Sequence, residues 1–341
     1  MIIYSERYLE HNLEYHPENS NRLKAVMKLL TKKDVFEKVP LVEPTYAKKE
    51  DILRVHTPEH FELIKHLSEK GEATIGADTY VNSKSFDTAM LSSGGIISCV
   101  DKYFEGYKYS FALVRPPGHH AETNRSMGFC LFNNIAVGAK YAMEKYGLKK
   151  IFVLDYDVHH GNGTQEIFYS SKNVLYLSLH QYPLYPGTGS IEEMGKDEGR
   201  GYTINVPLPP KTCDKSYLRV FDEVVIQVMK EFRPELIFVS AGYDAHHSDP
   251  LGGMRLSSRC YYEIAKKLKL GTKAGLIFGL EGGYNTDALA SSVFATLAAL
   301  FELGEEPAEM PLEENKKITS YVESRIAAVK KNLSSYWSFR I

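Results

Sequence analysis

Short apolar runs alternate with longer amphipathic segments along most of this chain, and this alternation constrains the fold more than any other sequence feature. The short runs are rich in Val, Ile, Leu and Phe, which is typical of strands buried on both faces of a sheet. The longer segments carry apolar residues at helical spacing, and one is bounded by Thr57, Pro58 and Gly71. We expect strands at 1–4, 109–114, 151–154, 173–179, 203–206, 235–240 and 274–280. We expect helices at 20–30, 57–71, 86–104, 135–146, 217–232, 261–268 and 287–303.

Strands that alternate with helices predict an α/β fold with a mostly parallel central sheet and helices on both faces. The chain has 341 residues, 43% of them hydrophobic, which is enough for one large core. No linker, repeat or low-complexity tract divides it. We therefore predict a single domain over 1–341, with a core at 1–304. The charged extension at 305–341, helical at 321–329, is expected to pack on that core.

The net charge and the lengths of the apolar runs argue against nucleic-acid and membrane partners. The formal net charge is −2 and the basic residues are dispersed, which predicts no nucleic-acid or membrane partner. The first residues lack the apolar segment of a signal peptide, and no apolar run reaches the about 18 residues that span a bilayer. The four cysteines are far apart and form no C-x-x-C pair, so we expect reduced core thiols in a cytoplasmic protein.

The stretch 150–164, KIFVLDYDVHHGNGT, combines a buried strand with a polar exit. Asp155, Asp157 and His159 follow the apolar run at spacing two, so an extended chain places their side chains on one side. Two carboxylates and an imidazole in one small volume indicate a bound cation, although a polar strand end at the surface is the simpler alternative. Gly161 and Gly163 predict a tight turn in a loop at the rim of a cleft.

Polar side chains also follow three other predicted strands. RPPGHH presents His119 and His120, Asp244 lies four residues after another strand, and Tyr284 follows two glycines in EGGYN. Each feature alone is more often structural than functional. Because an open parallel sheet binds its ligand beyond the carboxyl ends of its strands, we expect all four exits to form one site there.

These residue types suit metal-assisted hydrolysis. Asp157, His159 and Asp244 supply two oxygens and one nitrogen and leave a position for water, as catalytic zinc requires. Iron(II), cobalt or manganese remain alternatives because the ligands are rich in carboxylate. A nearby histidine is suited to proton transfer, and a tyrosine hydroxyl to oxyanion stabilisation.

The order of the motifs resembles that of the histone deacetylase and acetylpolyamine amidohydrolase superfamily, which has an arginase-like α/β fold. The resemblance covers about 1–303, and HPENSNRL is similar to a motif of class II deacetylases and their prokaryotic relatives. The other motifs that carry it are RPPGHHA, GFCLFNN, D-x-D-V-HHGNGTQ, SLHQYP…PGTG, SAGYDAHHSDPLGG and LEGGYN.

The resemblance implies a role for each matching residue. Asp157, His159 and Asp244 would bind one zinc ion per chain. His120 would be the general base and acid, and Tyr284 would polarise the acyl carbonyl. His119, oriented by Asp155, would assist electrostatically. Asn162 stands where class I enzymes have an aspartate, which should make His120 less basic.

The resemblance also implies two structural potassium sites. The first would use the side chains of Asp155 and Ser178, with backbone carbonyls of Asp157, His159 and Leu179. The second would use Phe168, Ser171, Val174 and Tyr202.

Further matching positions concern the substrate. Gly128 and Phe129 match one wall of the acyl channel, and Tyr185 stands where a second phenylalanine is usual. Asp78 resembles a rim aspartate that binds substrate backbone amides. Polyamine-selective members can carry an acidic residue at the position of Leu251, so leucine favours acyl-lysine, although it could simply pack beneath the loop.

The predicted function is hydrolysis of an N-acetyl amide of a lysine side chain, peptide or small amine to acetate and free amine. The alternatives are an acetylpolyamine amidohydrolase, a ureohydrolase with two manganese ions, and a non-catalytic acyl-binding protein. A ureohydrolase would need carboxylates where His119, His120 and His159 stand, and a binding protein has no use for Tyr284.

Overall fold

The computed structural model describes residues 1–339, and its central feature is a sheet of eight strands that are all parallel. The strand order is β2-β1-β5-β10-β9-β6-β7-β8. The strands are β1 (Ile2–Ile3), β2 (Leu41–Val42), β5 (Tyr109–Ala112), β6 (Ile151–Asp155), β7 (Val174–Gln181), β8 (Thr203–Leu208), β9 (Leu236–Ala241) and β10 (Gly275–Leu280). A separate antiparallel hairpin contains β3 (Ala73–Ile75) and β4 (Thr79–Val81).

Helices follow most of the strands. They are α1 (Asn21–Lys32), α2 (Val35–Lys38), α3 (Lys49–Ile52), α4 (Pro58–Lys70), α5 (Ser85–Phe104), α6 (Asn134–Tyr146), α7 (Asn162–Phe168), α8 (Asp214–Val220), α9 (Ile226–Phe232), α10 (Ser258–Gly271), α11 (Thr286–Phe301) and α12 (Lys316–Leu333). Short 3-10 turns lie at Glu6–Leu9 and Asp197–Gly199. The caps expected around 57–71 are confirmed, because the Thr57 side chain accepts from the amide of His60 and Gly71 ends α4.

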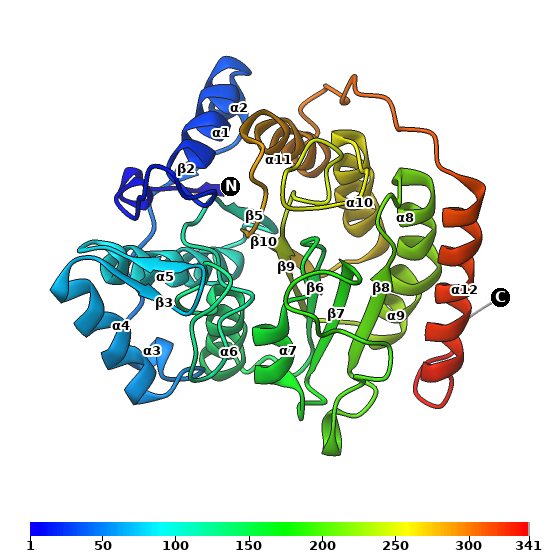
Figure 1. The fold of residues 1–341 in the computed structure, drawn as a ribbon, viewed down its shortest axis with the longest axis horizontal. Coiled ribbons are helices and arrows are strands. Elements are labelled where there is room, and N and C mark those ends of the chain that lie inside the picture. Colours follow the sequence, from blue (N-terminus) through cyan, green and yellow to red (C-terminus); the bar gives the residue numbers. More distant parts are fainter. Residues whose placement is uncertain (340–341) are drawn as a thin grey trace.

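Two helical layers cover the sheet (Figure 1). One layer contains α5, α6 and α7, and the other contains α1, α8, α9, α10 and α11. Every residue of β6, β7, β9 and β10 is buried, as expected for strands covered on both faces. The predicted α/β fold class is confirmed.

The direction of the chain reverses between β6 and β9. From β6 the chain continues through α7 to β7, towards one edge of the sheet, whereas from β9 it continues through α10 to β10, towards the other edge. The loops that leave the carboxyl ends of β6 and β9 therefore separate and leave a crevice between them. This topology positions the site described below.

One local expectation was wrong, and one helix differs in detail. The helix predicted at 217–232 is present: it begins at Asp214 and continues to Phe232 through a π-helical turn at Phe221–Val225. Gly163 does not form a loop but lies in the first turn of α7, where a Cβ atom would come within 2.2 Å of the Ala121 carbonyl oxygen. Gly163 therefore permits close packing of this helix rather than a turn.

The C-terminal extension packs on the core, and α12 lies along the edge strand β8 (Figure 1). The Trp337 indole contacts the rings of Tyr202 and Phe232, and its Nε1–H donates to the Gly201 carbonyl at 2.7 Å. This packing protects an edge that could otherwise pair with another chain.

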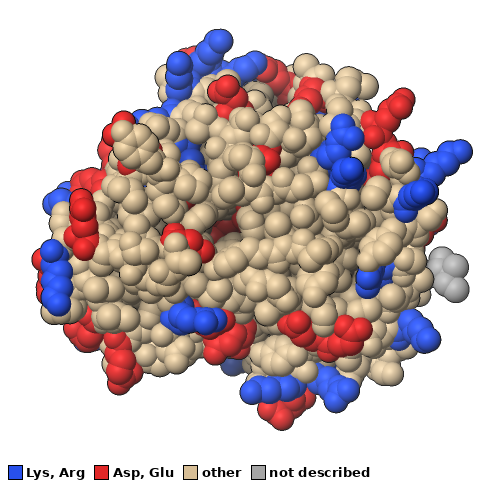
Figure 2. Space-filling model, in the orientation of Figure 1, with Lys and Arg blue, Asp and Glu red and all other residues tan. Residues whose placement is uncertain are grey.

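Among the helices that the structure describes, none is both long enough and apolar enough to cross a membrane. In Figure 2, Lys, Arg, Asp and Glu are interspersed around the outline of the face shown, with no continuous basic patch on it.

Candidate active site

The carboxyl ends of neighbouring strands bring three of the predicted residues together. Asp157 and His159 follow β6, and Asp244 follows β9, which pairs with β6 in parallel. The His159 Nδ1 atom lies 3.1 Å from Asp157 Oδ1 and 3.2 Å from Asp244 Oδ2. Candidate ligand atoms of these three residues all lie within 4.8 Å of one another. The predicted convergence across two loops is therefore present in the structure.

The electrostatics of this cluster indicate a need for positive charge. Both carboxylates are fully buried. Burial and the neighbouring Asp157 raise the pKa of Asp244 to about 7. Burial would lower the pKa of His159, but hydrogen bonds to the two carboxylates more than offset this and raise it to about 10. A divalent cation among two oxygens and one nitrogen would replace the proton that the carboxylates hold on His159, so the residues fit such an ion.

The tandem histidines lie beside this cluster, with ring centroids 4.0 Å apart. His119 Nδ1 is 3.1 Å from Asp155 Oδ2, and His120 Nδ1 is 2.8 Å from Asn162 Oδ1. The two rings thus have different partners, a carboxylate for His119 and a neutral amide for His120. This difference was expected from the sequence.

The different partners separate the protonation behaviour of the two histidines. Burial would lower the pKa of His119, but Asp157 and Asp155 more than offset this and raise it to about 10. Burial and the charge of His119 lower the pKa of His120 well below its ordinary value. One ring therefore favours the protonated form and the other the neutral form.

The turn that carries Tyr284 is held by the buried carboxylate of Asp249. Its Oδ2 atom accepts from the amide of Tyr284 at 2.6 Å, and its Oδ1 atom accepts from that of Leu251 at 3.0 Å. The Tyr284 hydroxyl makes no hydrogen bond to any residue in 1–339. Burial raises the pKa of Tyr284 well above its ordinary value, so the hydroxyl stays protonated and is free to donate.

Sequence reasoning missed a buried ion-pair network beneath this turn. Glu18 accepts from Arg115 at 2.5 and 2.8 Å and from Arg22 at 3.0 Å, and all three side chains are at most 1% exposed. Arg22 also donates to the carbonyls of Glu281 and Gly283, and its guanidinium lies 5.0 Å from the centre of the Tyr284 ring. These residues lie in HPENSNRL and RPPGHHA, motifs in which no role was predicted for Glu18, Arg22 or Arg115.

The buried carboxylate of Glu281 was also missed. Its Oε2 atom accepts from the amides of Gly118 and His119 at 2.7 and 3.1 Å, which fixes the turn that presents the histidine pair. Burial raises the pKa of Glu281 to about 7. Only the neighbourhood of Gly282 and Gly283 in the sequence could have pointed to this residue.

Glu18→Gln should lower the free energy of unfolding by about 3–5 kcal/mol at neutral pH, because it leaves two buried guanidinium groups without their carboxylate. Burial would raise the pKa of Glu18, but Arg115 and Arg22 more than offset this and lower it to about 2 from 4.5. The stabilisation is thus complete above pH 4.5 and is lost as the pH falls through about 2. Urea unfolding at several pH values measures this.

Glu62→Gln is the matched control, since Glu62 pairs with Lys49 at the surface with 52% of its side chain exposed. It should have little effect at any pH. A Glu18→Gln protein as stable as the parent at neutral pH would contradict the stabilising role of the network.

A cavity of about 260 Å³ leads to the cluster and is lined by all five predicted substrate residues. Gly128 and Phe129 both have positive φ, and a Cβ atom on Gly128 would lie 2.3 Å from the His120 ring, so only glycine fits there. The Asp78 Oδ1 atom accepts from the amide of Gly128 at 3.2 Å. The cavity is lined by Asp78, His120, Gly128, Phe129, His159, Leu184, Tyr185, Leu251 and Tyr284. Leu184 was not predicted.

The predicted potassium residues lie at both ends of β7. Ser178 pairs with Asp155 across β6 and β7, beside the candidate metal cluster, and its hydroxyl lies 2.8 Å from His180 Nδ1. The residues of the second predicted site lie near the amino ends of β7 and β8, away from the cavity: Phe168, Ser171, Val174 and Tyr202. Both potassium sites stay predictions.

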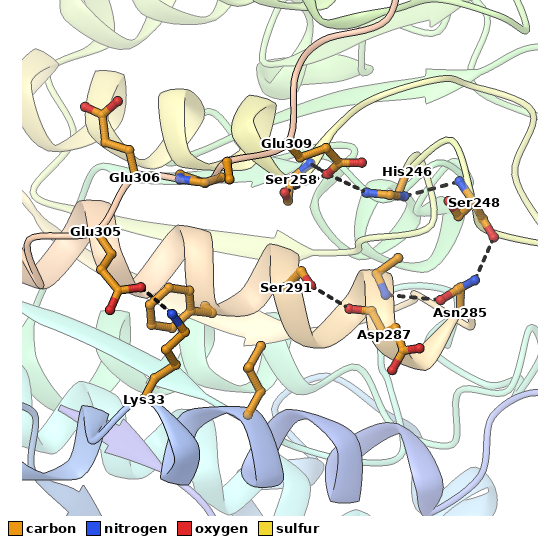
Figure 3. A pocket seen from close by; sticks show the side chains of 15 residues that line it. Lys33, His246, Ser248, Ser258, Asn285, Asp287, Ser291, Glu305, Glu306 and Glu309 are labelled. Atoms are coloured by element: carbon orange, nitrogen blue, oxygen red, sulfur yellow. Dashed lines mark hydrogen bonds and ion pairs between the residues drawn. The ribbon is translucent and has the colours of Figure 1, made fainter.

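A second, larger cavity of about 580 Å³ lies between α1, α11 and the C-terminal segment (Figure 3). Glu309 there contacts His246 and His247 at 3.1 and 2.7 Å, and its carboxylate also accepts from Ser258. The backbone amide of Ser248 donates to His246 Nδ1, which leaves the proton of the neutral ring on Nε2, where it faces Glu309. This cluster is therefore held by hydrogen bonds and anchors the extension to the Asp244 loop.

Fold and site together define an α/β protein whose buried histidines, carboxylates and tyrosine meet at the carboxyl edge of a parallel sheet. A histone deacetylase domain matches residues 16–300. The chain belongs to the histone deacetylase family, and it is a deacetylase of that family.

Individual relatives agree with this assignment. A probable deacetylase of Archaeoglobus fulgidus is 39% identical over 98% of both chains. Histone deacetylase 14, chloroplastic, of Arabidopsis thaliana is 39% identical over 89% of this chain and 77% of its own length. The crystal structure of the HDA15 HD domain superimposes with a TM-score of 0.91 at 35% identity, covering 98% of this chain and 96% of that one.

Proposed function

We propose that this protein is a zinc-dependent deacetylase that hydrolyses the N-acetyl amide of a lysine side chain or a small amine to acetate and the free amine. The observation that carries the proposal is that His120, His159 and Tyr284 line one cavity whose floor adjoins Asp157 and Asp244. Asp157, His159 and Asp244 would hold the zinc, and iron(II), cobalt or manganese would suit the same donors. The bound ion would supply Lewis acidity to a water molecule and to the acyl carbonyl.

The side chains account for the proton transfers. His120 is neutral and takes a proton from the water as the oxygen bonds to the acyl carbon. The same proton then passes to the amine nitrogen as the C–N bond breaks. Tyr284 donates a hydrogen bond to the carbonyl oxygen as negative charge develops there. His119, hydrogen-bonded to Asp155, would assist electrostatically without taking the proton itself.

A panel assay tests the proposal. Protein stripped with a chelator and reloaded with zinc is given acetyl-lysine peptides, free acetyl-lysine and acetylated polyamines, and acetate release is measured. We expect release only after metal is restored, with one ion per chain at Asp157, His159 and Asp244. No release from any substrate by loaded protein would refute the proposal, and two ions at the site would favour a ureohydrolase.

Leu251→Glu should shift substrate preference towards acetylated polyamines. Leu251 lines the cavity, and a carboxylate there would attract a distal ammonium group. The ratio of kcat/KM for an acetylated polyamine to that for an acetyl-lysine peptide should rise about tenfold, equal to about 1.4 kcal/mol. Leu251→Gln, of equal size but neutral, is the control. An unchanged ratio for Leu251→Glu would show that Leu251 does not govern selectivity.

A further inference from the structure

A chain of hydrogen bonds runs from His120 to the protein surface. Asn162 accepts from His120 Nδ1 through Oδ1 at 2.8 Å, and its Nδ2 atom donates to Glu122 Oε1, also at 2.8 Å. Glu122 in turn accepts from Arg125 at 3.0 and 2.9 Å, in a bidentate pair. Glu122 does not line the catalytic cavity, and its side chain is 21% exposed. Its carboxylate therefore reaches His120 only through the amide of Asn162.

The carboxylate decides which way the Asn162 amide points. An amide has one end that accepts and one that donates, and rotating it by half a turn exchanges them. A carboxylate can only accept, so Nδ2 must face Glu122 and Oδ1 must face His120. The Met127 sulfur, 3.4 Å from Nδ2, favours the same orientation only weakly, because a thioether is a weak acceptor.

The orientation of the amide decides where the His120 proton lies. Because Oδ1 can only accept, the neutral imidazole must carry its proton on Nδ1, and Nε2 is left with a free lone pair. If the amide were reversed, its NH₂ group would face Nδ1 and drive the proton to Nε2. A ring in that tautomer cannot take a proton from water at Nε2.

We propose that Glu122, held by Arg125, is a positioning residue that sets the tautomer of His120 through Asn162. The proposal rests on the proposed function, in which Nε2 of His120 is the base. The hydrogen bond between Asn162 and Glu122 does not depend on that role. Through it, a neutral amide fixes the proton of His120 on Nδ1, as a carboxylate in direct contact with the ring would.

The backbone around Glu122 is fixed without its side chain. Its amide donates to the Arg125 carbonyl at 2.9 Å, and its own carbonyl lies 3.0 Å from His56 Nδ1. Substitution of the side chain should therefore leave the loop in place. Glu122→Gln keeps the size of the side chain but presents either end of an amide to Asn162, so the orientation is no longer dictated.

The test combines nitrogen NMR of the histidine rings with kinetics of the full-length, zinc-loaded protein. His120 is assigned by the signal lost in His120→Ala. We expect the parent protein to show His120 with its proton on Nδ1. In Glu122→Gln a substantial fraction of the molecules should carry the His120 proton on Nε2 instead. The kcat of this variant should fall about tenfold, with KM little changed. Retention of the Nδ1–H tautomer with kcat within about twofold of the parent would refute the proposal.

A double variant separates positioning from general damage to the loop. Glu122→Gln with Asn162→Asp exchanges the carboxylate and the amide, so an obligate acceptor again faces Nδ1. This pair should restore the Nδ1–H tautomer and recover kcat relative to Glu122→Gln. Failure to restore that tautomer would overturn the proposal, since a merely structural defect is not repaired by the exchange.

Glu166→Gln is the matched control. Glu166 accepts from the amide and hydroxyl of Thr123 in the same loop, but it makes no hydrogen bond to Asn162. Tautomer and kcat should both be unchanged. If the parent protein lacked deacetylase activity, the proposed function would fail, yet the tautomer of His120 in parent and variant would still decide the role of Glu122.

Discussion

Replacement of Tyr284 by phenylalanine should reduce kcat by about 100- to 1,000-fold while zinc stays bound. The hydroxyl has no hydrogen-bond partner within residues 1–339, and it lines the cavity beside His120 and His159. Its raised pKa keeps the proton on the oxygen, so it can donate to a developing oxyanion. Because Asp249 and Arg22 hold the turn through its backbone, the ring should stay in place without the hydroxyl.

Steady-state kinetics and metal content of the purified variant check this expectation. Tyr262→Phe, in α10 and outside the cavity, makes the same chemical change and should leave kcat unaltered. Near-normal turnover of Tyr284→Phe with zinc bound would remove the oxyanion role assigned to this tyrosine. A loss of zinc would show instead that the hydroxyl supports the metal cluster.

His120→Ala should lower kcat by about 100- to 10,000-fold, more than His119→Ala does. Burial lowers the pKa of His120 and so keeps this ring neutral, as a base must be, whereas His119 is hydrogen-bonded to the carboxylate of Asp155. His119→Ala removes a charge near the reaction but leaves the proton acceptor in place. Kinetics of both variants with the same acetyl-lysine peptide give the ranking.

Thermal unfolding must accompany these measurements, because both rings are buried and both substitutions remove packed atoms. His66→Ala, at an exposed position of α4, controls for the loss of an imidazole as such. If both variants are folded and His119→Ala loses more kcat than His120→Ala, His119 rather than His120 would be the main proton acceptor.

The strands and the chemistry of their exits were predictable because both are local patterns. The uninterrupted apolar run of β6 reflects burial on both faces, and the spacing of two between Asp157 and His159 is visible in the sequence. Asp244 and Tyr284 were expected at the same edge because parallel strands have a common direction. The boundaries of the helices were predicted less well: the helix expected at 261–268 spans Ser258–Gly271.

The residues that hold the site together were not predictable in this way. Glu18 lies 97 positions from Arg115, and Glu281 lies 163 positions from Gly118. No periodicity links such pairs, and a lone glutamate in a sequence is more often a solvated side chain. Only a close approach in the fold turns these carboxylates into buried partners of guanidinium groups and backbone amides.

The sequence by itself determined the α/β class, the parallel sheet and the edge at which the polar residues gather. The reason is that helices alternating with strands serve as crossover connections, which make neighbouring strands parallel. Only the tertiary structure decided which side chains form hydrogen bonds and ion pairs with one another. Those effects depend on separations of about 3 Å between side chains from distant segments. They also depend on burial, which makes the charge of His119, the neutrality of His120 and the direction of the Asn162 amide properties of the assembled site.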